Sequence, residues 1–231
     1  MTSFVDDELG EIIVRRRNNV RNLRIRLGKD GRYIVYAPNL TPVLYIKKTI
    51  KDSRENLKKM RLSVCSNIYN DKQSIGKNHK IAVIKTGLIS KPEVKLQKQL
   101  LLVYIPPSHN ISDTEVQQQI RDYVAKILRK EAKEYLPRRI KYLAERYDFG
   151  YSSVRFSHAC SRWGSCSSSK KISLNIALMK LPDELIDYVL IHELSHTIHM
   201  NHSKKFWAEV ERCDPKYKLH KASLKNESPV I

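Results

Sequence analysis

The sequence predicts an α+β fold, with a mostly antiparallel N-terminal sheet followed by a helical C-terminal half. Three observations favour it: short segments of alternating apolar residues early in the chain, a long apolar-periodic segment after residue 112, and an apolar run ending near residue 191. We divide the chain into a mostly β region at 1–110, a helical region at 111–218 and a polar tail at 219–231, which we expect to be frayed.

The first region begins with a predicted β-hairpin. Residues 23–27 alternate apolar side chains with arginines, and the turn pair Asp30-Gly31 leads into a second strand at 33–37. Thr41-Pro42 then starts a helix that we expect to run to about Met60.

Apolar segments at 80–85 and 100–105 predict two further strands. Ser112, Asp113, Thr114 and Glu115 form the pattern of a capping box, which opens a long helix with apolar residues on one face. Because proline lacks an N–H group, Pro137 should kink or divide this helix.

The last third of the chain predicts two strands before a buried helix. Residues 154–158 and 171–178 alternate enough to be strands, joined by a Gly- and Ser-rich turn from Gly164 to Ser169. Residues 181–191 then carry a proline and acids followed by an apolar run, which is typical of the start of a buried helix.

The end of this helix carries His192-Glu193-Leu194-Ser195-His196, the pattern of a zinc hydrolase site. On a helix, His192 and His196 project from one face about one turn apart, so two imidazole nitrogens can bind one zinc ion. Glu193 follows the first ligand and can act as a general base toward water that the metal activates. The alternative is an ordinary amphipathic helix with two surface histidines.

A catalytic zinc site needs a third protein ligand and an open position for water. We favour His202, six residues after His196, because a ligand from beyond the helix completes a tetrahedron more easily. In the related motif a glycine permits the chain to turn back; Asn201 is the residue expected to permit that turn here. The other nearby candidates are His199, Glu209 and Glu211.

The formal net charge is +19, from 43 Lys and Arg against 24 Asp and Glu. Such a surface attracts polyanions, so nonspecific nucleic-acid affinity is expected. However, the basic residues are spread along the sequence and do not alternate with aromatic residues, which argues against a specific nucleic-acid platform.

No apolar run is long enough to span a membrane, and the acidic residues 1–11 lack the pattern of a signal peptide. We therefore expect a cytoplasmic protein with no membrane partner. The four cysteines contain no C-x-x-C pair, so a cysteine zinc site is not expected, and we interpret Cys160 and Cys166 as small core residues. The sequence does not indicate an oligomeric state.

Several motifs together resemble the YgjP-like metallopeptidases, which are relatives of the SprT-like zinc proteins. The segments that carry the resemblance are His192 to His196, Asn201-His202-Ser203, Phe206-Trp207, Arg162 to Ser167, Ile172 to Asn175 and Asp187-Tyr188-Val189. The resemblance implies a zincin-like metallopeptidase region at 111–218, with zinc held by His192, His196 and His202 and with Glu193 as the base. A lysine-rich segment at 71–99 departs from the family pattern.

The resemblance also implies a substrate class. In zincins an edge strand above the active-site helix can pair with an extended peptide, so we expect a peptide or protein substrate. The candidate substrate-binding residues are then Arg162, Trp163, Gly164 and Ser165 at the rim of the cleft. The alternative is that Trp163 packs in the core and Arg162 pairs with an acid.

The function that we predict is a zinc metallopeptidase-like hydrolase. One alternative is a zinc hydrolase of nucleotides or other phosphorylated small molecules, because zinc-activated hydroxide attacks phosphorus as well as carbon. The other is a noncatalytic nucleic-acid-associated protein in which zinc is structural and has four protein ligands.

Overall fold

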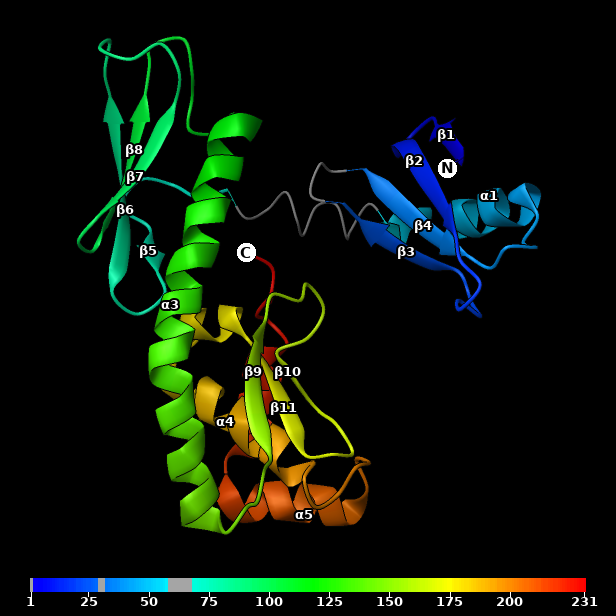
Figure 1. The fold of residues 1–231 in the computed structure, drawn as a ribbon, viewed down its shortest axis with the longest axis vertical. Helices are drawn as coiled ribbons and strands as arrows, with labels where there is room; N and C mark the ends of the chain where they lie inside the picture. The colour runs from blue at the N-terminus through cyan, green and yellow to red at the C-terminus, as the bar shows by residue number, and fades with distance from the viewer. Residues whose placement is uncertain (1, 29–31, 58–67) are drawn as a thin grey trace. The chain divides into compact units, whose positions relative to one another are not determined.

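The computed structural model describes residues 2–28, 32–57 and 68–231 (Figure 1). The chain forms two compact units, Met1–Asn67 and Ile68–Ile231. The division into regions that we predicted at residues 110 and 218 stays a prediction. The α+β fold class is confirmed, since antiparallel-rich sheets precede a helical C-terminal half.

The first unit is a four-stranded sheet with a helix on one face. Its strands are β1 (Thr2–Asp6), β2 (Gly10–Arg16), β3 (Arg24–Leu27) and β4 (Tyr33–Ala37), in the order β1-β2-β4-β3. Strands β2 and β4 run parallel, and the other two pairs are antiparallel. The pairing of β3 with β4 confirms the predicted hairpin, whose turn pair Asp30-Gly31 lies outside the described residues.

Helix α1 (Val43–Asp52) covers this sheet with its buried residues Ile46 and Ile50. The prediction of one helix to about Met60 is wrong in its length: α1 ends at the cap residue Ser53, and a separate helical turn follows at 54–57. Residues 58–60, at the end of the predicted helix, lie outside the described residues.

The second unit opens with a sheet of the same topology as the first. Strands β5 (Ser74–Ile75), β6 (His79–Lys85), β7 (Glu93–Gln97) and β8 (Leu100–Ile105) have the order β5-β6-β8-β7, again with one parallel pair between two antiparallel pairs. The predicted strands at 80–85 and 100–105 are confirmed. Identical connectivity in sheets of dissimilar sequence shows that the fold repeats a structural unit.

The lysine-rich segment 71–99 supplies three strands of this second sheet. Buried Glu131 of helix α3 (Thr114–Tyr147) accepts hydrogen bonds from the backbone N–H groups of Lys77 and Asn78, at 2.9 and 3.2 Å. These bonds attach the sheet to α3. In Figure 1 this sheet lies along one end of α3, while β9, β10, β11, α4 and α5 lie along the other end.

Helix α3 has 34 residues and continues through Pro137. We predicted that Pro137 kinks or divides the helix; division is wrong, and a kink stays a prediction. Leu136 and Ile140 on either side are fully buried in the core, and this packing compensates for the backbone hydrogen bond that proline cannot make. The predicted capping box does not form either, because Asp113 is the cap and its side chain instead accepts from the Asn110 N–H.

The remaining strands form a three-stranded sheet beside the C-terminal helices. They are β9 (Ser153–Ser157), β10 (Gly164–Cys166) and β11 (Lys171–Asn175), in the order β10-β11-β9. Residues 164–166 were predicted as part of a turn, and this is wrong: they pair antiparallel with β11 and form the edge of the sheet. The chain leaves β11 in a 3₁₀ helix at Ile176–Lys180, which shortens the strand predicted to reach residue 178.

Three helices complete the unit: α4 (Asp183–Ser195), α5 (Lys204–Cys213) and α6 (Tyr217–Leu224). The prediction of a frayed tail from residue 219 is wrong, because α6 covers its start and Ile231 is buried in the core. Lys180 Nζ also donates to the Val230 carbonyl at 2.8 Å. Across the described part of the chain, no helix combines the length and apolar character needed to cross a membrane.

Candidate active site

Helix α4 places the predicted zinc motif inside the second unit. Pro182 precedes the helix, and Asp183 and Glu184 lie in its first turn, where negative charge is favourable at the helix N-terminus. The rest is largely buried, because apolar residues occur on all sides of the helix and pack in the main core. The helix ends at Ser195 with His196 as its cap, so the motif lies at the last turn of a rigid element.

His192, His196 and His202 come together at this helix end. One potential ligand atom from each of the three lies within 4.8 Å of the others. The Nε2 atoms of His192 and His202 are 3.2 Å apart. Two nitrogens bound to one tetrahedral zinc ion lie about 3.3 Å apart, given Zn–N distances of about 2.0–2.1 Å, so the observed separation fits two ligands of one metal ion.

The backbone turn after α4 orients His196. The Nδ1 atom of His196 lies 3.0 Å from the His199 carbonyl oxygen. Because a carbonyl oxygen only accepts, Nδ1 carries the hydrogen and Nε2 is free to bind a metal. His199 therefore acts through its backbone and is absent from the histidine cluster. Asn201 does not have the positive φ that we expected for this turn.

The segment that follows returns His202 to the site. Ser203 caps α5, with its hydroxyl accepting from the Phe206 N–H at 3.5 Å. Phe206 is fully buried, and its ring centroid lies 4.5–5.0 Å from those of all three histidines. Trp207 stacks on the exposed His202, with ring centroids 5.7 Å apart, and its own ring stacks on Tyr217. The aromatic pair Phe206-Trp207 thus holds the imidazoles in place.

Burial favours the neutral form of His192 and His196. It lowers the pKa of His192 to about 3, with the charges of His196, His202 and Lys221 acting in the same direction. It also lowers the pKa of His196, against the opposing effect of the hydrogen bond to the His199 carbonyl. Neutral imidazole is the form that binds a metal ion, so these two side chains suit a metal at neutral pH.

Glu193 is a buried carboxyl group beside this cluster. The residue is 5% exposed, and its Oε2 atom has no hydrogen-bond donor among the described residues. Burial raises the pKa of Glu193 to about 8, against the opposing charge of Arg162. A buried carboxylate oxygen without a donor is costly as a purely structural feature, and it suits a group that receives a proton.

The edge strand β10 packs against Glu193. A Cβ atom added to Gly164 would stand 2.6 Å from Glu193 Oε1, so only glycine leaves room for the carboxyl group here. Trp163 is partly buried against the main core, and Arg162 is exposed. Of the four predicted substrate-binding residues, Gly164 and Ser165 belong to β10, and Arg162 and Trp163 immediately precede it.

Asn175 anchors the loop that leads into β10. This fully buried side chain donates through Nδ2 to the carbonyls of Ala159 and Arg162, at 2.6 and 2.8 Å. Its Oδ1 atom accepts from the Ala177 N–H at 3.0 Å. The sequence pattern included Asn175 without assigning it a role. An Asn within the mostly apolar run at 172–179 is the signal that could have indicated one, because a buried polar side chain needs hydrogen-bond partners.

Other residues that the sequence analysis named lie outside the histidine cluster. Asp187 of α4 forms a bidentate ion pair with Arg139 of α3, which fixes one helix on the other. Cys160 is exposed, so its interpretation as a core residue is wrong, while Cys166 is partly buried. No disulfide is formed by Cys160, Cys166 or Cys213.

The fold and the histidine cluster define a candidate metallopeptidase domain. Residues 21–227 match the family of YgjP-like metallopeptidase domains. The chain therefore belongs to the YgjP-like metallopeptidase family, which confirms the resemblance inferred from its motifs. No curated protein matches the chain.

Two solved structures are similar to part of the chain, and both are crystal structures of metallopeptidase zymogens. Abylysin of Pyrococcus abyssi shares 25% identity over 39% of this chain and 91% of its own, with a TM-score of 0.37. Jannalysin of Methanocaldococcus jannaschii shares 18% identity over 39% of this chain and 93% of its own, with a TM-score of 0.35.

Proposed function

We propose that the protein is a zinc-dependent peptidase in which Glu193 is the general base. The observation that carries the proposal is the grouping of one potential ligand atom from each of three histidines within 4.8 Å, with the buried Glu193 following His192 in the chain. Its Oε2 atom has no hydrogen-bond donor among the described residues. Family membership supports the metallopeptidase class. The choice of zinc rests on the three imidazole ligands and the spacing of their nitrogens.

His192, His196 and His202 would hold the metal ion. When bound, zinc supplies Lewis-acid activation of water and of the scissile carbonyl group. The Phe206 ring packs against the imidazoles of His192 and His196 and restricts their orientation. The His199 carbonyl also fixes His196 through a hydrogen bond. Ligand side chains held rigidly in this way need to move little during the reaction.

Glu193 would move protons between the attacking water and the leaving group. In its ionised form, a carboxylate oxygen takes a proton from water and later delivers it to the nitrogen of the leaving amine. The pKa of about 8 that burial gives to this group lies near neutrality, where a carboxyl group both accepts and releases protons readily. Arg162 favours the ionised form because its positive charge lowers this pKa.

The backbone of β10 would bind the substrate. This strand pairs with β11 on one side only and forms the edge of its sheet, so its other edge can accept an extended peptide. Because Gly164 contacts Glu193, a peptide added along β10 would run close to the base. Main-chain pairing of this kind requires an extended substrate and demands little of its side chains.

Glu193→Gln tests the proposal, because glutamine keeps the size of the side chain and removes its basicity. Zinc-loaded wild-type and variant proteins are compared on a library of extended peptides and on nucleoside triphosphates. We expect the variant to retain zinc and to lose peptide hydrolysis by about two orders of magnitude or more. Wild-type rates in the variant contradict the role of Glu193. Hydrolysis of nucleotides alone, dependent on Glu193, moves the assignment to the phosphate-directed alternative.

A further inference from the structure

The first unit has a sheet face that α1 does not cover. Residues directly opposite each other in a sheet lie on the same face. Ile12, Val14 and Val35 point to the buried side against α1, so the residues between them point to the open side. On that side Arg15, Tyr36 and Arg24 lie in register on the three neighbouring strands β2, β4 and β3.

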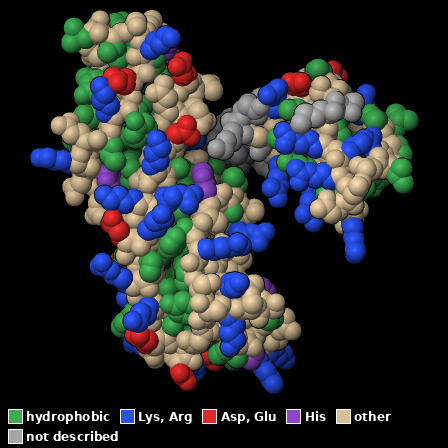
Figure 2. Space-filling view, viewed as in Figure 1, with side chains coloured by type: hydrophobic (Ala, Val, Ile, Leu, Met, Phe, Trp, Pro, Cys, Tyr) green, Lys and Arg blue, Asp and Glu red, His purple; other side chains and the backbone are tan. Residues whose placement is uncertain are grey.

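Two more arginines lie close to the ring of Tyr36. The guanidinium carbon of Arg17 lies 5.1 Å from the centre of the Tyr36 ring, and that of Arg26 lies 6.0 Å from it. Arg17, Arg24 and Arg26 are exposed, while Arg15 and Tyr36 are partly buried. We call these five residues the arginine face. Figure 2 shows Lys and Arg side chains gathered on the visible side of this unit.

The arginine face has no anionic partner within the described residues. None of its four arginines forms an ion pair or a side-chain hydrogen bond there, and Arg15 Nε is buried without an acceptor. Neighbouring arginines behave differently. Arg16 donates to the carbonyls of Asn39 and Thr41, which precede α1. Arg32 pairs with Glu11 at 3.0 Å. The charge on the arginine face is therefore available to an external ligand.

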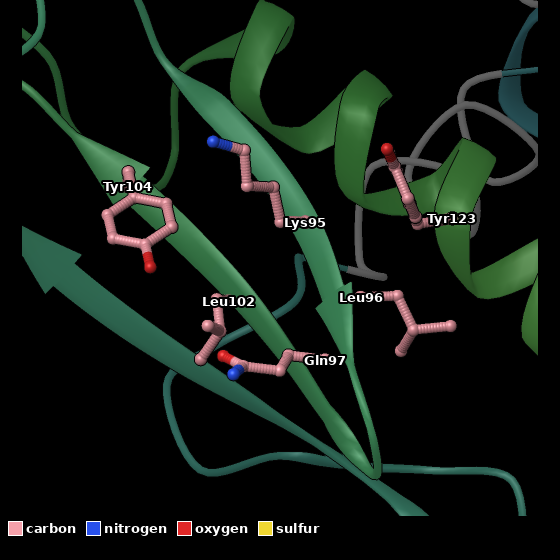
Figure 3. A pocket seen from close by; sticks show the side chains of 6 residues that line it. All are labelled: Lys95, Leu96, Gln97, Leu102, Tyr104 and Tyr123. Carbon is pink, nitrogen blue, oxygen red and sulfur yellow. The ribbon is translucent and has the colours of Figure 1, made fainter.

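The second sheet shows that this clustering is not required by the fold. Its strands have the same order and register, so Tyr104 takes the place of Tyr36. The residues opposite Tyr104 are Ile84 and Glu93 instead of arginines. Among the described residues, Lys95 is the one cation near its ring, at 5.9 Å from the ring centre. Lys95, Leu102 and Tyr104 help to line a hollow of about 450 Å³ on this sheet. Figure 3 shows these side chains on their strands. The arginine face is thus a feature of the first sheet alone.

We propose that the arginine face binds single-stranded nucleic acid. Adjacent strands are about 4.8 Å apart, so Arg15 and Arg24 stand about 10 Å apart on either side of Tyr36 and can contact different phosphates. Guanidinium groups also stack on bases, and the partly exposed Ile13 and Ile34 on the same face offer apolar contacts to them. The chain thereby gathers on one surface basic residues that are scattered in sequence.

The shape of the face favours a single strand over a duplex. The major groove of B-form DNA is about 12 Å wide and admits a helix or a two-stranded ribbon. A four-stranded sheet spans about 14 Å between its outer strands, so it cannot enter the groove face-on. A duplex would also hide its bases from the guanidinium planes and from Ile13 and Ile34.

The test is fluorescence anisotropy of a labelled oligothymidylate of about 20 nucleotides, titrated with the full chain over a range of salt concentrations. The variant Arg17→Gln, Arg24→Gln, Arg26→Gln changes only exposed side chains of the arginine face. The matched control Arg129→Gln, Lys130→Gln, Lys133→Gln removes the same charge from exposed positions on α3. Circular dichroism and thermal unfolding verify that both variants are folded.

We expect the arginine-face variant to bind at least tenfold more weakly near 0.1 M salt. Its slope of log K against log salt should be shallower by about 2, since each phosphate contact on a single strand contributes about 0.7. The control should bind within about twofold of wild type. Tyr36→Leu keeps all charges but removes the ring that orders Arg17 and Arg26, so it should weaken binding with little change in slope.

Equal weakening in the variant and the control overturns the proposal, because net charge alone would then explain the binding. Tighter arginine-dependent binding to a duplex of the same length, or to vesicles containing phosphatidylserine, also overturns it and assigns the face to that ligand. The catalytic proposal is independent of this outcome: Glu193→Gln should bind the oligonucleotide as wild type does.

Discussion

Gly164 of the edge strand lies directly against the carboxyl group of Glu193. An added Cβ would stand 2.6 Å from Oε1 and 2.7 Å from Cγ of Glu193. Such a contact forces either the strand or the carboxyl group to move. The absence of a side chain at residue 164 therefore links the position of the predicted base to that of the predicted substrate strand.

Gly164→Ala tests this link. We expect the added methyl group to displace Glu193, to reduce kcat/KM by at least tenfold and to destabilise the protein by about 1–3 kcal/mol, the usual cost of overpacking. Zinc content should be unchanged, because the ligands are on other residues. Gly150→Ala is the matched control, since a Cβ there meets nothing within 4 Å. Full activity in Gly164→Ala would show that the carboxyl position is not critical.

A comparison of two histidine variants tests the proposed ligand set. Removing a residue that only hydrogen-bonds to a metal ligand typically lowers metal affinity by roughly 10- to 100-fold. His202→Ala should lower zinc affinity by more than this, because it removes a proposed ligand itself. His199→Ala should keep zinc, because His199 contributes only its backbone carbonyl to His196. Equilibrium zinc titration against a competing chelator measures both. If His199→Ala loses zinc while His202→Ala retains it, the ligand set is wrong.

We expect the free energy of unfolding of the first unit to fall in acid, because Asp6 becomes protonated. Burial acts to raise the pKa of Asp6, but hydrogen bonds from Arg54 and from the Glu8 and Leu9 N–H groups outweigh it and lower the pKa. The folded pKa thus lies below the unfolded value of about 3.9. The carboxylate contributes its full stability above that value and loses it as the pH falls through the folded pKa.

Asp6→Asn should therefore weaken the acid dependence of the first unit. Asparagine keeps an oxygen that can accept from the backbone, but it has no proton to gain. Amide hydrogen exchange of β2 and β4, compared at about pH 6 and about pH 3, measures the difference. The exposed Asp7 provides the control, and Asp7→Asn should leave the wild-type acid dependence in place. Identical acid dependence in Asp6→Asn and wild type would exclude Asp6 as its source.

Local patterns predicted much of the fold and the three histidines that the structure groups together. The spacing of His192 and His196 fixes their geometry once the segment is helical, so the sequence was sufficient there. The strands at 80–85 and 100–105 also follow from short-range alternation. These features depend on neighbouring residues and not on the rest of the chain.

The features that sequence reasoning missed depend on contacts between distant segments. Strand β10 contains Gly and Ser and is defined by pairing with β11, which no local propensity reveals. Helix α3 continues through Pro137 because of core packing on both sides. The arginine face requires the register of β2, β4 and β3, including a parallel pair, and that register brings Arg15 and Arg24 to either side of Tyr36.

If a peptide binds along β10 as we propose, the effect of a proline should depend on its position within the peptide. In an added strand, the N–H groups of alternate residues point toward the protein. Proline has no N–H group, so it should impair cleavage at alternate positions and be tolerated at those between. The measurement is kcat/KM for a peptide series in which one proline is moved along the positions that flank the scissile bond.

A parallel series with alanine at the same positions controls for side-chain effects. Each lost bond should reduce kcat/KM by roughly 2- to 10-fold, corresponding to the net value of about 0.5–1.5 kcal/mol for a hydrogen bond. Equal tolerance of proline at every position would exclude strand addition, and the peptide would then have to be held by its side chains.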